Sequence, residues 1–273
     1  MSQPIHTPRR TVATQPVARR QVRRGKRTVA APAGFNWRWV SLSICLAMIG
    51  LMVYVFITPT FYVTHAEIGG LRYVPAEEVY GAAGIANYHV LFIDPAQVQR
   101  NVLQSPSLES AQVSVSWPAQ VVINVVERDP ALVWEQGSER YWVDVNGNLM
   151  QLRRDLPNLV RVVNEGDAIP FRCQGPSCSG GSTQTPGIDP DVVLGAQQLK
   201  TLRSNIDVLY YDPVRGLSYQ DGRGWRAYFG KGTDMADKLR VYETMVNNLI
   251  SRGVQPARID VSNLSAPYYS VKP

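Results

Sequence analysis

Residues Ser114–Pro130 read SVSWPAQVVINVVERDP, and their pattern is the clearest sign of the fold in this chain. Apolar and polar residues alternate on both sides of a Trp-Pro pair, and a period of two is typical of a half-buried β-strand. The apolar positions that share one face, beginning just ahead of this stretch, are Ala111, Val113, Val115, Val121, Ile123 and Val125. The sequence therefore predicts two antiparallel strands with one face on a core and one face in water.

Two features of this stretch give sharper expectations. Trp117 continues the apolar face of the first strand, so we expect a buried ring whose truncation to alanine removes about 3–5 kcal/mol of stability. The second strand stops at Pro130, which has no N–H to donate to a central ladder. We expect Glu127 and Arg128, just before this proline, to cap and solubilise an edge strand.

Two short helices are expected between an opening strand and this pair. Pro75 lies at the start of the first helix and Gly84 follows its end, while Asp94 and Pro95 are suited to be the N-cap and first residue of the second. The resulting order, β-α-α-β-β within Phe61–Asp129, predicts a small three-stranded α+β module. The two helices are expected to cover its apolar face.

The basic charge of the chain is concentrated in its first 38 residues, which hold nine Arg and Lys and no acidic residue. The remainder carries 19 basic and 22 acidic side chains. Several prolines and few bulky apolar residues predict a disordered tail over residues 1–38. Its basic cluster suits either nucleic-acid binding by phosphate neutralisation or a topogenic role ahead of a membrane span.

The next segment decides between these two roles. Residues 39–57 are nineteen residues without a charge, which as a helix extend about 28 Å, close to the thickness of a bilayer core. A cleaved signal peptide is the alternative, but FITPTFYV offers no small-x-small cleavage site. We therefore expect an uncleaved single span in the cell membrane with the tail in the cytoplasm and the remainder outside, and no nucleic-acid binding.

Residues 130–273 are expected to form a second mixed domain with an antiparallel sheet and helices. A helix is predicted to begin at Asp189, and a long amphipathic helix is predicted over Asp234–Arg252. A last strand near Arg258–Asn263 has no later strong strand with which to pair. We expect this strand to be an edge, with the two exported domains meeting near Arg128–Leu132.

Residues 63–130 resemble the polypeptide-transport-associated (POTRA) module of FtsQ/DivIB-type cell-division proteins. The residues that carry the resemblance are the opening strand Val63–Gly69, LFID at Leu91–Asp94, Pro106–Pro118 with its closing Trp-Pro, and VVERDP at Val125–Pro130. The resemblance continues through a hairpin at Val133–Met150, LPNLV at Leu156–Val160 and the final strand. It departs in the longer loop Asn164–Gly187 and at the C-terminus.

The resemblance implies a non-enzymatic scaffold at the division septum. The expected parts of the chain are the tail 1–38, the membrane span 39–57, the POTRA module 60–129 and a second exported domain over residues 130–273. Its implied partners are bitopic coiled-coil proteins of FtsL and FtsB/DivIC type and the septal peptidoglycan synthase. It also implies that a partner adds a strand near the C-terminus. The residues to which this points are Val261, Ser262, Asn263, Leu264, Tyr268 and Tyr269. The alternative for the two tyrosines is that they cap the core of their own domain.

Catalytic and metal-binding motifs are missing from the sequence. The three histidines, His6, His65 and His89, lie in no nucleophile or metal motif, and GWRAYFGKGT departs from a phosphate loop at two positions. The carboxylates Asp144, Asp212, Asp221 and Asp260 lie at strand ends or turns, where aspartate is ordinary. We expect no enzymatic activity and no cofactor.

Two other classes of protein are alternatives to a division scaffold. A chaperone-like POTRA module of a translocation channel would need a long barrel, and residues 131–273 are too short and too helical for one. A membrane-anchored hydrolase with an unrecognised site would show activity in a hydrolase assay.

Cys173 and Cys178 flank a short loop and suit a local disulfide outside the membrane, while Cys45 is expected to be an apolar filler in the span.

Overall fold

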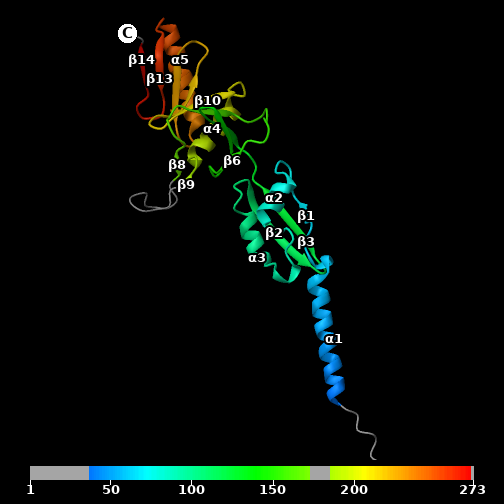
Figure 1. The fold of residues 1–273 in the computed structure, drawn as a ribbon. Coiled ribbons are helices and arrows are strands. Elements are labelled where there is room, and N and C mark those ends of the chain that lie inside the picture. The colour runs from blue at the N-terminus through cyan, green and yellow to red at the C-terminus, as the bar shows by residue number, and fades with distance from the viewer. Residues whose placement is uncertain (1–36, 173–184, 272–273) are drawn as a thin grey trace, which may run out of the picture. The chain divides into compact units, whose positions relative to one another are not determined.

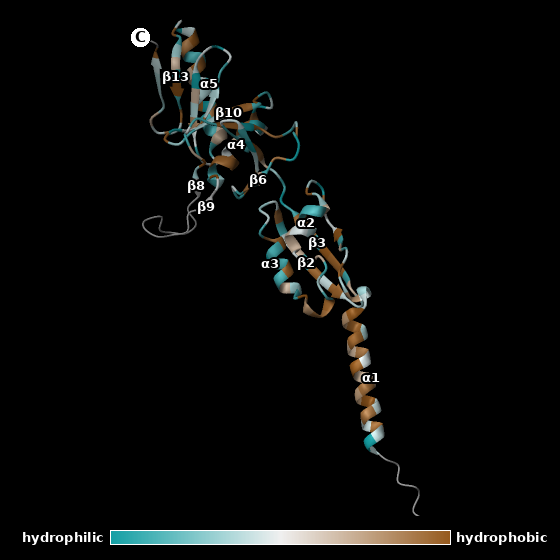
Figure 2. Ribbon diagram, in the orientation of Figure 1, coloured by the Kyte–Doolittle hydropathy of each residue, from teal (hydrophilic) through white to brown (hydrophobic). Residues whose placement is uncertain are grey.

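The computed structural model of the chain describes residues 37–172 and 185–271, so the predictions for most of the tail and for Cys173 and Cys178 lie outside it. Helix α1, Trp37–Ile57, is the one helix among the described residues that is long and apolar enough to cross a membrane, with a mean hydropathy of 2.5. Figure 2 shows hydrophobic residues along its length. It begins two residues before the predicted span and indicates a single-pass membrane protein.

All the strands that the structure describes lie in one compact unit, residues 54–273. Its first portion, the three-stranded module, contains two short 3-10 turns, two helices and three strands (Figure 1). In chain order these are η1 Pro59–Phe61, β1 Glu67–Gly69, α2 Ala76–Ala83, η2 Val90–Phe92, α3 Pro95–Val102, β2 Leu108–Ser116 and β3 Gln120–Glu127. The predicted order β-α-α-β-β is confirmed.

Local signals position the helices of the module. Asp94 caps α3, because its Oδ1 accepts a hydrogen bond from Ala96 N at 3.0 Å. Gly84 ends α2 in the left-handed conformation, with a φ of 66°. Side chains from both helices and from the predicted sheet face make one core. It includes Val79, Ala83, Val98, Val102, Leu108, Ala111, Val121, Ile123 and Val125.

The expectation that Trp117 is buried is wrong, since its side chain is 60 % exposed. Strand β2 ends at Ser116, which pairs with Gln120, so Trp117 lies in the three-residue connection to β3. The alternation of faces holds only while the strand continues. The Trp117 ring therefore lies past the sheet and packs edge-on against Phe61, with 5.5 Å between the ring centroids.

Trp117→Ala is accordingly expected to lower the free energy of unfolding by no more than about 1 kcal/mol, the range of an exposed aromatic pair. Ile123→Ala in the same module, at a fully buried position, should cost about 2–5 kcal/mol. Chemical denaturation of the two variants measures the difference. A loss for Trp117→Ala as large as that for Ile123→Ala would contradict the exposed position.

The expectation that Glu127 solubilises an edge strand is also wrong. The strand order is β1-β3-β2, so β3 lies in the middle of its sheet, parallel to β1 and antiparallel to β2. Glu127 is 3 % exposed. Its carboxylate accepts hydrogen bonds from the backbone N–H groups of Arg72, Tyr73 and Val74 at 2.7–3.1 Å. The side chain thus fixes the segment that follows β1.

The second portion is built on a nine-stranded sheet (Figure 1). Its strands are β4 Leu132–Gln136, β5 Glu139–Val143, β6 Leu149–Gln151, β7 Arg161–Asn164, β10 Val208–Asp212, β11 Gly216–Gln220, β12 Arg226–Gly230, β13 Pro256–Asp260 and β14 Tyr268–Val271. In space the order is β14-β13-β12-β11-β10-β7-β4-β5-β6. The sheet is mixed, because β7 pairs in parallel with β4 and β10, and β12 pairs in parallel with β13. A separate two-stranded ladder joins β8 Phe171–Arg172 and β9 Thr185–Pro186.

Two helices cover this sheet and supply much of its core. They are α4, Pro190–Leu202, which packs on β11, and α5, Met235–Ser251, which packs on β12 and on α4. The helix predicted to begin at Asp189 is α4, and the Asp189 side chain caps it by accepting from Asp191 N at 3.1 Å. All five predicted apolar positions of the long helix are buried, namely Met235, Leu239, Tyr242, Val246 and Leu249. The sheet contributes Trp134, whose side chain is fully buried.

Candidate partner-binding edge

The C-terminal edge of the nine-stranded sheet is formed by β14. Strand β13 is paired on both sides, in parallel with β12 and antiparallel with β14, so the expectation that it is an edge strand is wrong. The pairing brings Ile259 opposite Tyr269 and Asp260 opposite Tyr268. Strand β14 is therefore the edge strand, and the backbone N–H and C=O groups on its outer side face away from β13.

Asp260 organises the connection between the last two strands. Its side chain is 5 % exposed in the structure. One carboxylate oxygen accepts from Ser262 N at 3.0 Å and from Ser262 Oγ at 2.6 Å, and the other accepts from the Tyr268 hydroxyl at 3.1 Å. One buried carboxylate thus holds both the turn that leaves β13 and the first residue of β14.

The predicted residues Val261, Ser262, Asn263 and Leu264 lie in the connection that follows β13. Val261 is fully buried, and its N–H donates to Tyr228 O at 2.9 Å. Ser262 lies so close to Gly230 that a Cβ there would be 2.9 Å from the Ser262 Cβ, and Gly230 has a φ of 74°. These backbone contacts fix the connection before any partner binds. Direct partner contact by its side chains stays a prediction.

The two predicted tyrosines lie on β14 itself and differ in their surroundings. Tyr268 is held by its own domain, through the hydrogen bond to Asp260 and the guanidinium of Arg258, 5.8 Å from its ring centroid. Tyr269 and Val271 point the other way, because side chains alternate along a strand. All three side chains are exposed, Tyr268 at 49 %, Tyr269 at 39 % and Val271 at 55 %. Val271 was missed by sequence reasoning. The aromatic and β-branched run YYSV is the signal that could have identified β14 as a strand.

The four turn carboxylates take the ordinary role expected of them. Asp144 accepts from Asn146 N at 2.9 Å, Asp212 from Val214 N at 2.7 Å, Asp221 from Arg223 N at 3.0 Å, and Asp260 from Ser262 N at 3.0 Å. Each bond reaches two residues along the chain and closes a turn. Within residues 37–172 and 185–271, no three His, Cys, Asp or Glu side chains gather as a metal site.

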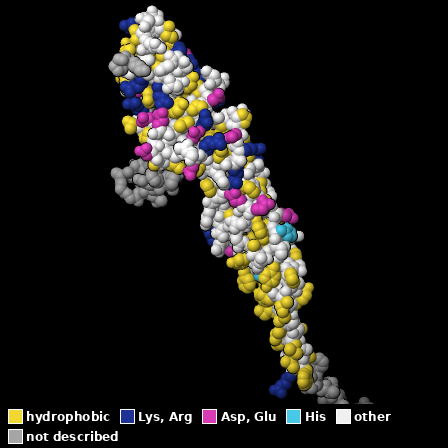
Figure 3. All heavy atoms as spheres, turned by 45° about the horizontal axis from the view of Figure 1, so that its top comes forward, with side chains coloured by type: hydrophobic (Ala, Val, Ile, Leu, Met, Phe, Trp, Pro, Cys, Tyr) yellow, Lys and Arg dark blue, Asp and Glu magenta, His cyan; other side chains and the backbone are white. Residues whose placement is uncertain are grey.

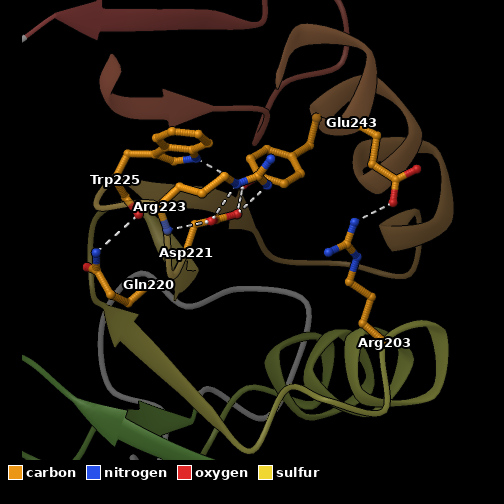
Figure 4. A network of polar contacts seen from close by, with 7 residues as sticks. Arg203, Gln220, Asp221, Arg223, Trp225 and Glu243 are labelled. Carbon is orange, nitrogen blue, oxygen red and sulfur yellow. Dashed lines mark hydrogen bonds and ion pairs between the residues drawn. The ribbon is translucent and has the colours of Figure 1, made fainter. Parts of the chain in front are cut away.

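Asp221 is also the centre of a buried polar network that supports the sheet (Figure 4). The Arg223 side chain donates to both of its oxygens at 2.8–2.9 Å, the Tyr242 hydroxyl donates to it at 2.5 Å, and the Trp225 indole N–H donates to that hydroxyl at 3.0 Å. The Arg223 guanidinium holds the pKa of Asp221 well below its usual range, with a further contribution from Tyr242. Burial, and then Asp221, raise the pKa of Tyr242. The network clamps the β11–β12 turn to α5.

This network predicts a pH-dependent stability. Since the pKa of Asp221 is depressed in the folded state, its contribution is fully present above the ordinary aspartate pKa of about 3.9 and is lost as the pH falls below it. Asp221→Asn should therefore lower the free energy of unfolding by about 1–3 kcal/mol at pH 7 and reduce the difference from wild type towards pH 2. Denaturant unfolding between pH 2 and pH 7 measures this, with the exposed Asp237→Asn as a control. A difference that stays constant across this range would contradict the assignment.

Comparison with known proteins finds a family match, and it finds relatives that align with this chain over different lengths. Residues 61–128 match the family described as "POTRA domain, FtsQ-type". The cell division protein FtsQ of Chloroflexus aurantiacus is 28 % identical over 276 residues, covering 94 % of each chain. FtsQ of Zymomonas mobilis is 34 % identical over 88 residues, 32 % of this chain and 28 % of the relative. The cell division protein DivIB of Clostridium tetani is 26 % identical over 115 residues, 41 % of this chain and 43 % of the relative.

Proposed function

We propose that this chain, which is of FtsQ/DivIB cell-division type, acts as a non-catalytic scaffold at the division septum. In this role it recruits bitopic coiled-coil proteins of FtsL and FtsB/DivIC type and links them to the septal peptidoglycan synthase, whose activity it helps to control. The relatives' names support cell division as the process. The resemblance of the sequence motifs to those of FtsQ/DivIB-type proteins supports the choice of partners.

The observation that carries the proposal is the open edge of β14. Its outer backbone groups are the terminal row of a nine-stranded sheet, and an extended segment of a partner adds to such a row through main-chain hydrogen bonds. Tyr269 and Val271 supply exposed apolar side chains beside that row. Because Asp260 and Tyr268 hold β14 on its own sheet, little ordering entropy remains to be lost when a partner strand binds.

The proposal includes an arrangement of the chain across the cell membrane. The tail 1–38 lies in the cytoplasm, α1 anchors the chain in the bilayer, and residues 60–129 and 130–273 form two exported domains. The nine basic residues before and at the start of α1 support this orientation, because positively charged flanks stay on the cytoplasmic side.

Fluorescence microscopy of the full chain fused at its N-terminus to a fluorescent protein tests this function. The proposal predicts a band at mid-cell in dividing cells. A matched fusion of residues 1–60, which lacks the exported part, should label the envelope evenly. An even envelope signal from the full chain, at the same expression level, would contradict a role at the septum.

A further inference from the structure

Three uncharged segments of the chain meet at the point where α1 ends. They are residues 54–62, YVFITPTFY, residues 85–93, IANYHVLFI, and residues 115–121, VSWPAQV, and none of them contains Asp, Glu, Lys or Arg. Their one titratable side chain apart from the tyrosines is His89, which is 4 % exposed. Runs of this composition are unusual in turns, which polar residues normally occupy.

Direct contacts join the last turn of α1 to the second segment. The His89 ring is stacked on Phe56 with 5.0 Å between centroids, and its Nε2 lies 3.2 Å from Val55 O. The Tyr62 hydroxyl donates to Phe56 O at 2.7 Å, and Val63 N donates to Tyr88 O at 2.9 Å. The end of α1 and the η2 turn are therefore packed together.

Large apolar side chains remain exposed around these contacts. We call Tyr88, Leu91, Phe92 and Trp117 the juxtamembrane apolar patch, and each is between 52 % and 67 % exposed. Phe92 lies 6.2 Å from Phe56 and Trp117 lies 5.5 Å from Phe61, measured between ring centroids. Figure 3 shows hydrophobic side chains gathered where the chain passes from α1 into the three-stranded module.

We propose that the juxtamembrane apolar patch inserts into the headgroup region of the bilayer that α1 crosses. The inference rests on the proposed anchoring by α1. Its support is continuity with the membrane helix. That helix ends at Ile57, and Phe56 in its last turn and Phe61 just after it contact Phe92 and Trp117 of the patch. A surface attached in this way to a membrane span has lipid as its nearest neighbour.

The chemistry of the patch fits a lipid surface. Tryptophan and tyrosine favour the interface between hydrocarbon and water, because their rings are apolar while their N–H and O–H groups still reach polar partners. Leu91 and Phe92 supply apolar area for the boundary with the acyl chains. With no Lys or Arg in the three segments, attraction to anionic headgroups contributes little, so the insertion should not depend on salt or on anionic lipid.

Depth-dependent fluorescence quenching in the full chain tests the proposal. Each variant carries one cysteine, in a background in which the other native cysteines are replaced by serine, and is labelled with an environment-sensitive fluorophore. Phe92→Cys reports on the patch, Val214→Cys on a turn that is 91 % exposed in the nine-stranded sheet, and native Cys45 on α1. The proteins are reconstituted into phosphatidylcholine vesicles that carry nitroxide quenchers either near the headgroup or deep in the acyl chains.

The expected result is a blue-shifted Phe92→Cys emission that the headgroup quencher reduces, at low and at high salt. The Val214→Cys emission should be unshifted and unquenched, and Cys45 should respond to the deep quencher. Adding Trp117→Glu to the Phe92→Cys protein should reduce its quenching while its near-UV circular dichroism shows a folded module.

Three results would overturn the inference and separate its failure from that of the proposed function. If Cys45 is quenched but the Phe92→Cys label behaves like the Val214→Cys label, the anchor is real and the patch lies in water. If Cys45 is not quenched, the anchoring itself fails and the inference fails with it. If the Phe92→Cys label is shielded only after a coiled-coil partner is added, the patch binds protein rather than lipid.

Discussion

Glu127→Ala is expected to lower the free energy of unfolding of the three-stranded module by about 3–5 kcal/mol. The substitution leaves the backbone N–H groups of Arg72, Tyr73 and Val74 without their acceptor, and each buried unsatisfied donor costs about 1–3 kcal/mol. Residues 72 and 73 are partly accessible, so water recovers some of this loss. Hydrogen exchange of the β3 amides in the exported part measures the change directly.

Two further substitutions separate the hydrogen bonds of Glu127 from other effects. Glu127→Gln keeps one carbonyl oxygen, which can take the place of the Oε1 atom that accepts three N–H groups. Its loss of stability should therefore be clearly smaller than that of Glu127→Ala. Glu109→Ala removes an exposed glutamate from β2 and should change stability by less than about 0.5 kcal/mol. Equal stability of Glu127→Ala and Glu109→Ala would show that the buried carboxylate does not hold the turn after β1.

Tyr269→Glu is expected to weaken partner binding by about 30-fold or more while the domain stays folded. An aromatic anchor in the middle of an interface typically contributes about 2 kcal/mol or more, and a carboxylate in its place would be desolvated by the incoming strand. Since Tyr269 is already 39 % exposed, the unbound protein should tolerate the charge. Titration of the exported part with a purified FtsB/DivIC-type partner measures the affinity.

The choice of a point substitution follows from the contacts of β14. Deleting residues 264–273 would remove all of β14, together with its pairing to β13 and the hydrogen bond from Tyr268 to Asp260. A lost interaction after such a deletion could reflect an unfolded edge. Val214→Glu, in the turn between β10 and β11 with a side chain that is 91 % exposed, is the matched control and should bind like wild type. Unchanged affinity of Tyr269→Glu would remove Tyr269 from the interface.

The features predicted correctly from the sequence depend on residues close together in the chain. Asp94 followed by Pro95 places the start of α3, and the spacing of Met235, Leu239 and Tyr242 gives the buried face of α5. Caps and amphipathic faces are local properties, because each is completed within one or two helical turns. The turn carboxylates were assigned correctly for the same reason.

The features predicted wrongly depend on partners far away in the chain. Glu127 is buried because β3 pairs in parallel with β1, about fifty residues earlier, and alternation within β3 carries no record of that pairing. Strand β13 is internal because the short strand Tyr268–Val271 follows it. Trp117 was predicted wrongly for another reason, because the alternation of apolar and polar residues does not show at which residue a strand ends. The edge was therefore assigned to the segment of β13 although β14 forms it, and partner contact by the named residues stays a prediction.

Photo-cross-linking from the edge of β14 in dividing cells shows directly whether a partner binds there. A photoreactive phenylalanine derivative is placed at position 269 of the full chain, with position 214 as the control. We expect an adduct with a bitopic coiled-coil division protein from position 269 and none from position 214. A protein that still gathers at the septum but gives no such adduct from position 269 would contradict partner binding at β14.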